Sequence, residues 1–153
     1  MHFEGSQTIA APIEKVWQLL MDPQQIGPCL PGFQGIEVED AQHFKALVGV
    51  GVGFVKAKFT MDVSVVDQDP PTKATARAHG VAPISAVDVT STMTLHDEGS
   101  DTTQLQWAAD VVVSGTLASL GARLLTSTAR KMTGQFFNCI ARKLEEPAGN
   151  TGS

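Results

Sequence analysis

The sequence predicts a single α+β domain in which a curved antiparallel sheet of about seven strands wraps one long C-terminal helix. Three observations support this fold class. A length of 153 residues is that of one domain. Residues 33–113 alternate between apolar and polar side chains, which is the period of an antiparallel sheet with one wet face. After Gly115 the period becomes that of a helix and remains so to residue 144.

Short elements precede the sheet. Residues 2–10 alternate loosely and predict a first strand. The apolar residues between positions 13 and 21 recur at helical spacing, and Pro12 suits the first turn because its missing N–H would have no partner there. Residues 24–32 hold two glycines and two prolines, which indicates a short turn of helix followed by a loop. We therefore expect one or two short helices after the first strand.

The C-terminal helix matches the preceding strand in length. A helix over residues 117–144 would be about 42 Å long at the usual rise per residue, and a strand over residues 102–113 would be about 40 Å long. The helix can therefore lie along the sheet over its whole extent. Its apolar stripe is formed by Leu117, Leu120, Leu124, Thr128, Met132, Phe136 and Ile140.

Composition limits the classes of function. The net charge of −5 argues against nucleic-acid binding, which needs a basic face. Cys29 and Cys139 are too few and too far apart for a disulfide framework, and a reduced, cytoplasmic setting suits them better. The N-terminus lacks the features of a signal peptide, and no apolar run reaches the ~20 residues of a membrane span. We expect residues 1–146 to form one domain and residues 147–153 to be a flexible polar tail.

Small residues occupy the face of the sheet that the helix is expected to cover. Protein interiors do not normally tolerate the space that small residues leave on facing elements. Such a face either lets the helix approach the sheet closely or lines a ligand cavity, and both alternatives stay open at this point. The residues concerned are Ala46, Ala57, Ala74, Ala76, Ala78, Gly80 and Ala109 on the strands, with Gly121 and Thr128 on the helix.

No pattern of residues predicts a catalytic or metal site. The four histidines are scattered, and none has the spacing of a metal-ligand pair. Cys29 has no neighbouring base or cation to activate its thiol, so we interpret it as a loop-packing or pocket-gate residue. Asp62, Asp88 and Asp110 take the outward parity of their strands. The sequence therefore offers no acid–base pair for general catalysis.

Two further patterns have a structural as well as a functional explanation. Residues 49–54 are rich in glycine but lack the following helix that a phosphate-binding loop requires, so they predict a hairpin. Its apolar tip could act as a flap at a cavity entrance or could equally contact a partner or a membrane surface. Basic residues recur along the long helix, where they form either a solvated face or a surface for anionic lipid or an acidic partner. They are Arg123, Arg130, Lys131, Arg142 and Lys143.

Two motifs resemble those of a known family. The first is Asp22-Pro23-Gln24-Gln25-Ile26-Gly27-Pro28-Cys29-Leu30-Pro31-Gly32, and the second runs over residues 103–121 and ends in Gly115-Thr116-Leu117-Ala118-Ser119-Leu120-Gly121. With Phe136-Phe137 on the following helix, they are similar to the family of the CoxG subunit of carbon monoxide dehydrogenase, which belongs to the START-like (SRPBCC) superfamily. The similarity covers about residues 2–145 and implies the helix-grip fold of that superfamily.

The resemblance also implies a function. It suggests an accessory protein for a molybdenum-containing carbon monoxide dehydrogenase or a related hydroxylase, which recruits the enzyme to the cytoplasmic membrane and carries a quinone in an apolar cavity. The implied location is cytoplasmic, with peripheral contact to the inner face of that membrane. The chain departs from some members of the family by its short polar tail, and by residues 82–87 where others often carry glycines.

The leading hypothesis is a non-enzymatic carrier of a hydrophobic ligand, a menaquinone or another quinone, that links the dehydrogenase to the membrane quinone pool. No covalent cofactor is expected, and Thr128 is the expected contact for a ring carbonyl. The alternatives are a structural adaptor or assembly factor without a ligand, and an enzyme of the same fold acting on an aromatic or polyketide substrate. The expected ligand-binding residues are Ile26, Cys29, Leu30, Phe59, Met61, Met93, Trp107, Leu117, Leu120, Leu124, Thr128 and Met132.

Overall fold

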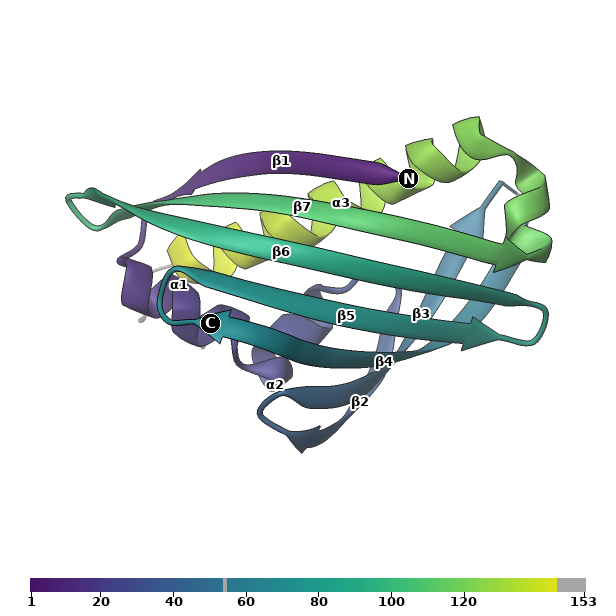
Figure 1. Ribbon diagram of the computed structural model, residues 1–153, viewed down its shortest axis with the longest axis horizontal. Coiled ribbons are helices and arrows are strands. Elements are labelled where there is room, and N and C mark those ends of the chain that lie inside the picture. Colours follow the sequence, from purple (N-terminus) through teal and green to yellow (C-terminus); the bar gives the residue numbers. More distant parts are fainter. Residues whose placement is uncertain (54, 146–153) are drawn as a thin grey trace.

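The structure, a computed structural model, describes residues 1–53 and 55–145. The predicted tail, residues 147–153, lies outside the described residues. The elements in chain order (Figure 1) are β1 (His2–Ile9), α1 (Ile13–Leu20), α2 (Pro23–Ile26), the 3₁₀-helix η1 (Gly27–Cys29), β2 (Phe33–Asp40), β3 (His43–Val52), β4 (Val55–Asp69), β5 (Lys73–Ala82), β6 (Ser85–Gly99), β7 (Thr102–Gly115), the 3₁₀-helix η2 (Thr116–Leu120) and α3 (Ala122–Glu145).

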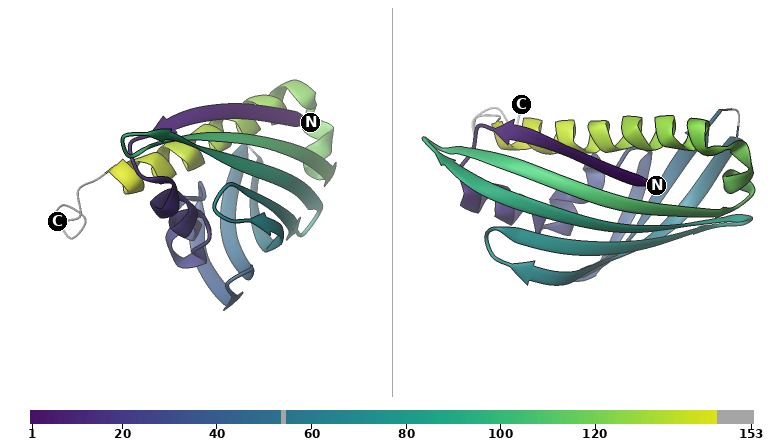
Figure 2. Two further views of the ribbon diagram at one scale, coloured as in Figure 1. Left: turned by 60° about the vertical axis from the view of Figure 1, so that its left-hand side comes forward. Right: turned by 45° about the horizontal axis from the view of Figure 1, so that its top comes forward.

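The seven strands form one antiparallel sheet in the order β1-β7-β6-β5-β4-β3-β2. From β2 to β7, each strand pairs with the next one in the chain. The first strand, β1, forms the edge of the sheet next to β7, and Gly5 lies opposite Trp107 there. The sheet curves, and α3 runs along its concave side (Figure 2). The α+β fold of a sheet that grips one long C-terminal helix is therefore confirmed, and so are two short helices after the first strand.

The long helix begins five residues later than the prediction. Residues 116–120 form η2, and α3 starts only at Ala122. The reason lies at Gly121, whose φ of +94° cannot continue a right-handed helix and turns the chain between the two elements. With 24 residues, α3 is about 36 Å long rather than 42 Å. Leu117 and Leu120 thus belong to η2 and not to the stripe of the helix.

The buried core contains two hydrophobic clusters, which lie toward opposite ends of the interface between the sheet and the helices. The first joins α1 and the second half of α3 to the sheet and includes the fully buried Ile9, Leu105 and Ile140. Thr103 is also fully buried there, and its hydroxyl donates a hydrogen bond of 2.7 Å to the carbonyl of Ala11. The second cluster contains Val48, Val52, Phe59 and Leu117. The stretch of sheet between the clusters is covered by α3 but is not filled.

Close backbone packing fixes the loop after η1 against the sheet. Gly32 has a φ of +74°, and its carbonyl accepts a hydrogen bond of 2.9 Å from the N–H of Gly49 on β3. A Cβ atom built on Gly32 would lie 2.0 Å from the carbonyl oxygen of Gly49. Residues 49–53 belong to the β3–β4 hairpin, as predicted, with Val52 opposite Val55, while Phe54 lies outside the described residues.

The expectation of two unpaired cysteines is wrong in this structure. Cys29 of η1 and Cys139 of α3 form a disulfide, with their Cα atoms 5.5 Å apart. They are 110 residues apart in sequence, and the fold brings them together because η1 packs against the second half of α3. The sequence spacing carried no sign of this tertiary contact. The disulfide ties the loop of the first motif to the long helix.

Removal of the disulfide should lower stability. A cross-link that closes a long loop restricts the unfolded chain, and Cys139→Ser is expected to lower the free energy of unfolding by about 3 kcal/mol. Chemical denaturation with and without dithiothreitol checks this, because the reductant should affect the native sequence and not the variant. Two free thiols that persist in the denatured native protein after treatment of the folded protein with an oxidant would contradict the pairing.

Candidate ligand-binding cavity

A cavity of about 370 Å³ lies between the concave face of the sheet and α3. Its volume is within the range of small-molecule sites. Side chains along a strand alternate between the two faces of the sheet, so every second side chain of β3 to β7 points toward α3 and can form the cavity wall. Many of these inward side chains are only half-buried, since they face the cavity and not packed neighbours.

The small inward residues serve two different purposes. Ala76, Ala78 and Ala109 line the cavity. Ala46 and Ala74 are instead buried among packed neighbours, so they allow close contact within the sheet's inner layer. Part of this face therefore lines a cavity and part of it is packed in the core, and the binding of a ligand in the cavity stays a prediction.

Gly80 on β5 shows how a small residue shapes the cavity wall. A Cβ atom built there would lie 2.3 Å from the sulfur of Met61 and 2.9 Å from Cγ1 of Val87. The absence of a side chain at Gly80 thus leaves room for Met61, which lines the cavity from the neighbouring strand.

An aromatic group forms one wall of the cavity. The rings of Trp107 and Phe137 stack with their centroids 5.0 Å apart and their planes at 14°. Phe136 meets Phe137 edge to face, also at 5.0 Å. Gly5 on β1 makes room for the indole, because a Cβ atom there would lie 2.5 Å from Cζ2 of Trp107. All three aromatic residues line the cavity and offer flat apolar surface to a ring.

Few polar groups reach this cavity. Its polar uncharged side chains are those of Ser91, Thr128 and Thr133. Thr133 donates a hydrogen bond of 2.7 Å to the carbonyl of Ala129 within α3. No hydrogen bond joins the hydroxyl of Ser91 or Thr128 to another group in residues 1–53 and 55–145. These two hydroxyls are therefore the groups that a polar atom of a ligand would find available.

The described residues form neither a charged catalytic group in the cavity nor a cluster of metal ligands. Among the described residues that line the cavity, Arg77 alone has a charged side chain, and it lies on the outward parity between Ala76 and Ala78. Within residues 1–53 and 55–145, no cluster of three His, Cys, Asp or Glu side chains could hold a metal ion. The arrangement can enclose an apolar molecule, and it offers no placed acid, base or nucleophile in the described wall.

The structure brings nine of the twelve predicted ligand-binding residues to this cavity. Their role in binding stays a prediction. The nine are Ile26, Leu30, Phe59, Met61, Met93, Trp107, Leu117, Thr128 and Met132.

The other three predicted residues lie outside the cavity wall. Cys29 is buried in the disulfide and the first core cluster. Leu120, in η2, packs at the edge of the second cluster. Leu124 is exposed at the start of α3, and Leu125 lines the cavity in its place.

Several lining residues were not named in advance. They extend the inward rows of the strands, and the period-two pattern that identified the sheet contained the signal for them. Those on β4, β6 and β7 include Val63, Val87, Val89, Ser91, Val111 and Val113.

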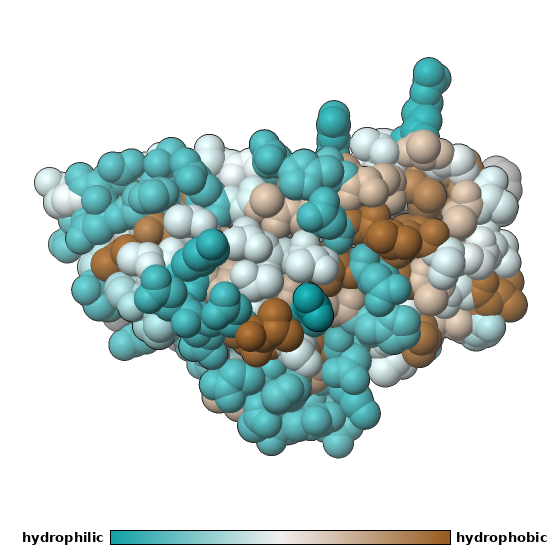
Figure 3. Space-filling model, viewed as in Figure 1, coloured by the Kyte–Doolittle hydropathy of each residue, from teal (hydrophilic) through white to brown (hydrophobic). Residues whose placement is uncertain are grey.

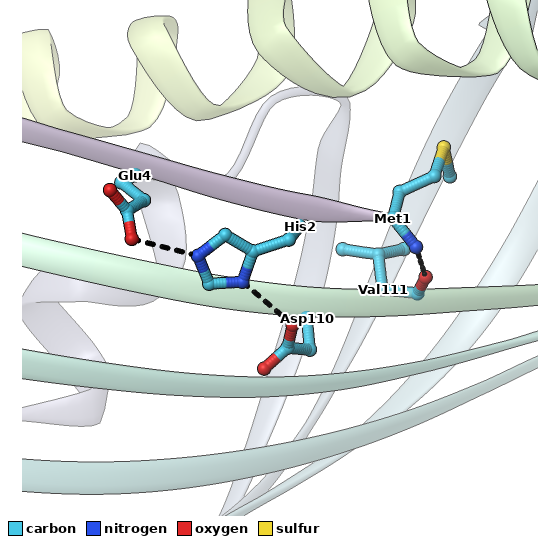
Figure 4. A network of polar contacts seen from close by, with 5 residues as sticks. All are labelled: Met1, His2, Glu4, Asp110 and Val111. Carbon is cyan, nitrogen blue, oxygen red and sulfur yellow. Dashed lines mark hydrogen bonds and ion pairs between the residues drawn. The ribbon is translucent and has the colours of Figure 1, made fainter.

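A polar cluster lies outside the cavity, on the outer side of β1 and β7 (Figure 4). The imidazole of His2 contacts the carboxylates of Glu4 at 2.9 Å and Asp110 at 2.7 Å. Next to it, the amino group of Met1 donates a hydrogen bond of 2.7 Å to the carbonyl of Val111. The hydrogen bond with Glu4, then that with Asp110, raises the pKa of His2 above its ordinary value of 6.5.

The raised pKa of His2 predicts a small pH dependence of stability. The protonated ring is favoured in the folded state, so its stabilising contribution is complete below pH 6.5 and is lost as the pH rises through the higher folded pKa. An NMR titration of the His2 ring should give a pKa above 6.5, and Glu4→Gln should lower it. A pKa of 6.5 or less in the native sequence would contradict the contacts in Figure 4.

The basic residues of α3 do not form one stripe. All five are exposed, but a helix turns by 100° per residue, so they point in several directions. Arg123 and Arg130 share a shallow hollow with Thr126 and Ser127. Near the other end of the helix, the ammonium group of Lys143 donates a hydrogen bond of 2.6 Å to the carbonyl of Gln25. The five basic residues are therefore spread over the exposed side of α3, which agrees with the solvated alternative, and they do not share one direction.

The comparisons with known proteins agree with this geometry. The sequence model of the family described as the CoxG subunit of carbon monoxide dehydrogenase matches residues 5–145. The chain belongs to this family. The predicted resemblance is thus confirmed, and CoxG membership together with the cavity indicates an accessory role with a hydrophobic ligand. No protein with curated annotation matches the chain in sequence.

Solved structures similar to this CoxG chain share its fold. A conserved protein from Geobacillus kaustophilus is 26% identical, with a TM-score of 0.86 over 94% of this chain and 95% of that one. The Zhui aromatase/cyclase from Streptomyces sp. R1128 is 19% identical, with a TM-score of 0.72 and 98% of both chains covered. A START superfamily protein from Mycobacterium smegmatis is 13% identical, with a TM-score of 0.71 over 94% and 97%. The START-like fold is therefore shown.

The helices give no sign of a membrane span. Within residues 1–53 and 55–145, no helix combines the length and the hydropathy that crossing a bilayer requires.

Proposed function

We propose that this CoxG protein is a non-enzymatic carrier of a quinone, of the menaquinone type, and that it links a molybdenum-containing carbon monoxide dehydrogenase or a related hydroxylase to the membrane quinone pool. The observation that carries the proposal is the cavity itself, whose described wall is almost wholly apolar and includes five aromatic residues. A quinone needs apolar enclosure for its tail, a flat surface for its ring and few polar contacts for its carbonyls.

The polar contacts of the ring would come from α3 and β6. Thr128 and Ser91 line the cavity, and each hydroxyl can donate one hydrogen bond to a carbonyl oxygen. The chain supplies no redox group, so electrons would pass between the bound quinone and the cofactors of the partner enzyme. The proposed location is the cytoplasmic side of the membrane, where the partner would meet the quinone pool. In a reducing compartment the Cys29–Cys139 pair would be open, since disulfides are rare there.

One neighbour supports a second candidate function. The Zhui protein is an aromatase/cyclase by name, and it shares the fold over nearly the whole chain. Such an enzyme needs a placed acid or base near its substrate. The described wall of this cavity holds no Asp, Glu or His side chain, which supports the carrier.

A fluorescence titration tests the proposal. Trp107 stacks on Phe137 in the cavity wall, whereas Trp17 packs against the first core cluster. In a Trp17→Phe background the emission therefore reports on the cavity alone. Titration with a short-chain menaquinone should quench Trp107 in a saturable manner with one equivalent bound. An unchanged emission of Trp107 at saturating menaquinone would overturn the carrier and leave the structural adaptor.

A further inference from the structure

One wall of the cavity is a short segment that also meets solvent. This strap, defined as residues 26–31, runs from the end of α2 through η1 toward β2. Ile26, Leu30 and Pro31 of the strap line the cavity. Pro28, in the same segment, is exposed to solvent. Because one short segment both lines the cavity and faces solvent, a displacement of the strap would open the cavity.

The strap joins one edge of the sheet to α3. The edge strand is β2, and the strap packs on it closely, since a Cβ atom built on Gly27 would lie 2.8 Å from Cδ1 of Ile36. Figure 2 shows the purple chain of α1 and α2 between the yellow end of α3 and the blue strands. At the opposite edge, β1 is linked to α3 by a hydrogen bond of 2.9 Å from Gln7 to Asn138. The strap therefore closes the space between sheet and helix on the β2 side.

The sheet forms the opposite wall of the cavity and is harder to open. Its seven strands are joined to their neighbours by hydrogen bonds. Hydrophilic residues, in teal, cover a large part of its outer face (Figure 3). Passage through the sheet would break several hydrogen bonds and would carry an apolar molecule across that face. The strap is therefore a more favourable side than the sheet for the exchange of a ligand.

Hydrogen bonds hold the two ends of the strap. The ammonium group of Lys143 donates one of 2.6 Å to the carbonyl of Gln25, and the N–H of Gly49 donates one of 2.9 Å to the carbonyl of Gly32. Between these two points, in the part of the chain that the structure describes, no hydrogen bond joins the strap to α3. The middle of the strap is therefore held to α3 by the disulfide and by apolar contacts.

The two cysteines of the disulfide differ in exposure. Cys29 is 4% exposed and belongs to the first core cluster. Cys139 is half-buried, and it follows Phe136 of the cavity wall by about one turn of α3. A thiol from solvent therefore reaches the sulfur of Cys139 before that of Cys29.

We propose that the Cys29–Cys139 pair is a redox site that controls access to the cavity. In the disulfide form the strap is held against α3, and the ligand is retained. In the dithiol form the strap separates from α3 and stays with β2, so the ligand can enter and leave. The control of ligand exchange rests on the proposed function, whereas the opening of the strap does not.

The reductant is a dithiol, and the reaction is thiol–disulfide exchange. A thiolate of the dithiol attacks Sγ of Cys139 and forms a mixed disulfide, while Cys29 leaves as a thiolate and takes up a proton. The second thiolate of the dithiol then displaces Cys139, which is protonated in turn, and the dithiol becomes a disulfide. Two electrons and two protons thus pass to the pair, and exchange with another disulfide reverses the reaction.

Loss of the bond makes a local opening of the strap less costly. While the disulfide is intact, Cys29 cannot move away from α3. In the dithiol form, the opening has to overcome only the apolar contacts of Cys29 and Ile26 with the first core cluster. Segments held by few apolar contacts open locally without global unfolding. The reduced chain should therefore keep its sheet and its long helix while the strap opens.

Alkylation of the reduced chain tests the opening without any ligand. The purified full chain is reduced with dithiothreitol, freed of the reductant without air and treated with iodoacetamide, and mass spectrometry follows Cys29 and Cys139 separately. We expect labelling of Cys29 at a rate that hardly changes at low urea concentrations, because a local opening exposes little surface. A rate for Cys29 that rises with urea in step with global unfolding would show that the strap stays closed and would overturn the proposal.

The release of a bound ligand tests the control of exchange. In the Trp17→Phe background, the disulfide and dithiol forms are loaded with a short-chain menaquinone and mixed with excess phosphatidylcholine vesicles, and the recovery of Trp107 emission gives the release rate. Release from the dithiol form should be at least about tenfold faster. The matched control, Cys29→Ala/Cys139→Ser in the same background, should release the ligand at the rate of the dithiol form with or without prior reduction. Equal rates for the disulfide and dithiol forms would overturn the control of exchange.

The two measurements separate this proposal from the carrier function. If menaquinone binds to neither form, the carrier function fails, and the labelling of Cys29 still decides whether the strap opens. If menaquinone binds but Cys29 is labelled only through global unfolding, the redox control fails and the carrier function stands.

Discussion

Ala109→Phe should abolish binding of menaquinone while the protein remains folded. Ala109 lines the cavity from β7, where its neighbours across the sheet are Phe3 and Ser91. A phenyl ring at this position would occupy space that is otherwise open to a ligand, so the protein loses a binding volume and gains apolar contacts. We expect the affinity to fall by at least about 100-fold, or about 2.8 kcal/mol. Quenching of Trp107 in the Trp17→Phe background measures the affinity.

The adjacent residue provides the control for this substitution. Ala108 lies on the outer side of β7, opposite Glu4 and Thr92, so Ala108→Phe adds the same ring on the other face of the sheet. Its affinity for menaquinone should stay close to that of the native sequence. If Ala109→Phe binds as tightly as Ala108→Phe, the ligand does not occupy this cavity.

Gly32→Ala, in the loop after η1, should cause a large loss of stability. The backbone of Gly32 has a φ of +74°, which costs an alanine about 1–2 kcal/mol. The new methyl group would also lie 2.0 Å from the carbonyl oxygen of Gly49, and neither backbone can yield without breaking their hydrogen bond. We expect a total loss of about 3 kcal/mol or more, which lowers the melting temperature by about 10 °C.

Gly35→Ala is the matched control for Gly32→Ala. Gly35 lies three residues further, on β2, and a Cβ atom built there meets nothing within 4 Å. The added methyl group reduces the freedom of the unfolded chain, so stability should be unchanged or slightly higher. Thermal unfolding of both variants checks the pair. A loss for Gly35→Ala as large as that for Gly32→Ala would show that the close contact with Gly49 is not the cause.

The fold was predictable from the sequence because its signals are local. Alternation over residues 33–113 and the change of period after Gly115 depend on neighbouring residues alone, and they identified the sheet and the helix. The family motifs added the correct superfamily. The predicted start of the long helix was wrong for a local reason as well. Gly121 adopts a positive φ, which the spacing of apolar residues does not reveal. The start of α3 follows from that single residue.

The site was predictable only in part because it depends on contacts between distant segments. Inward parity selected lining residues on the strands, such as Met61 and Met93. Predicting the pairing of Cys29 with Cys139 would require knowing how η1 packs on α3, and the periodicity of the sequence does not contain that information.

The most direct test of a quinone carrier is to identify what the cavity holds after purification from cells that make menaquinone. The protein is extracted with organic solvent, and the extract is analysed by mass spectrometry. We expect a lipoquinone in about equimolar amount, and we expect it to be lost in Ala109→Phe and kept in Ala108→Phe. A lipoquinone-free extract from the native sequence, together with no quenching of Trp107 on addition of menaquinone, would contradict the carrier.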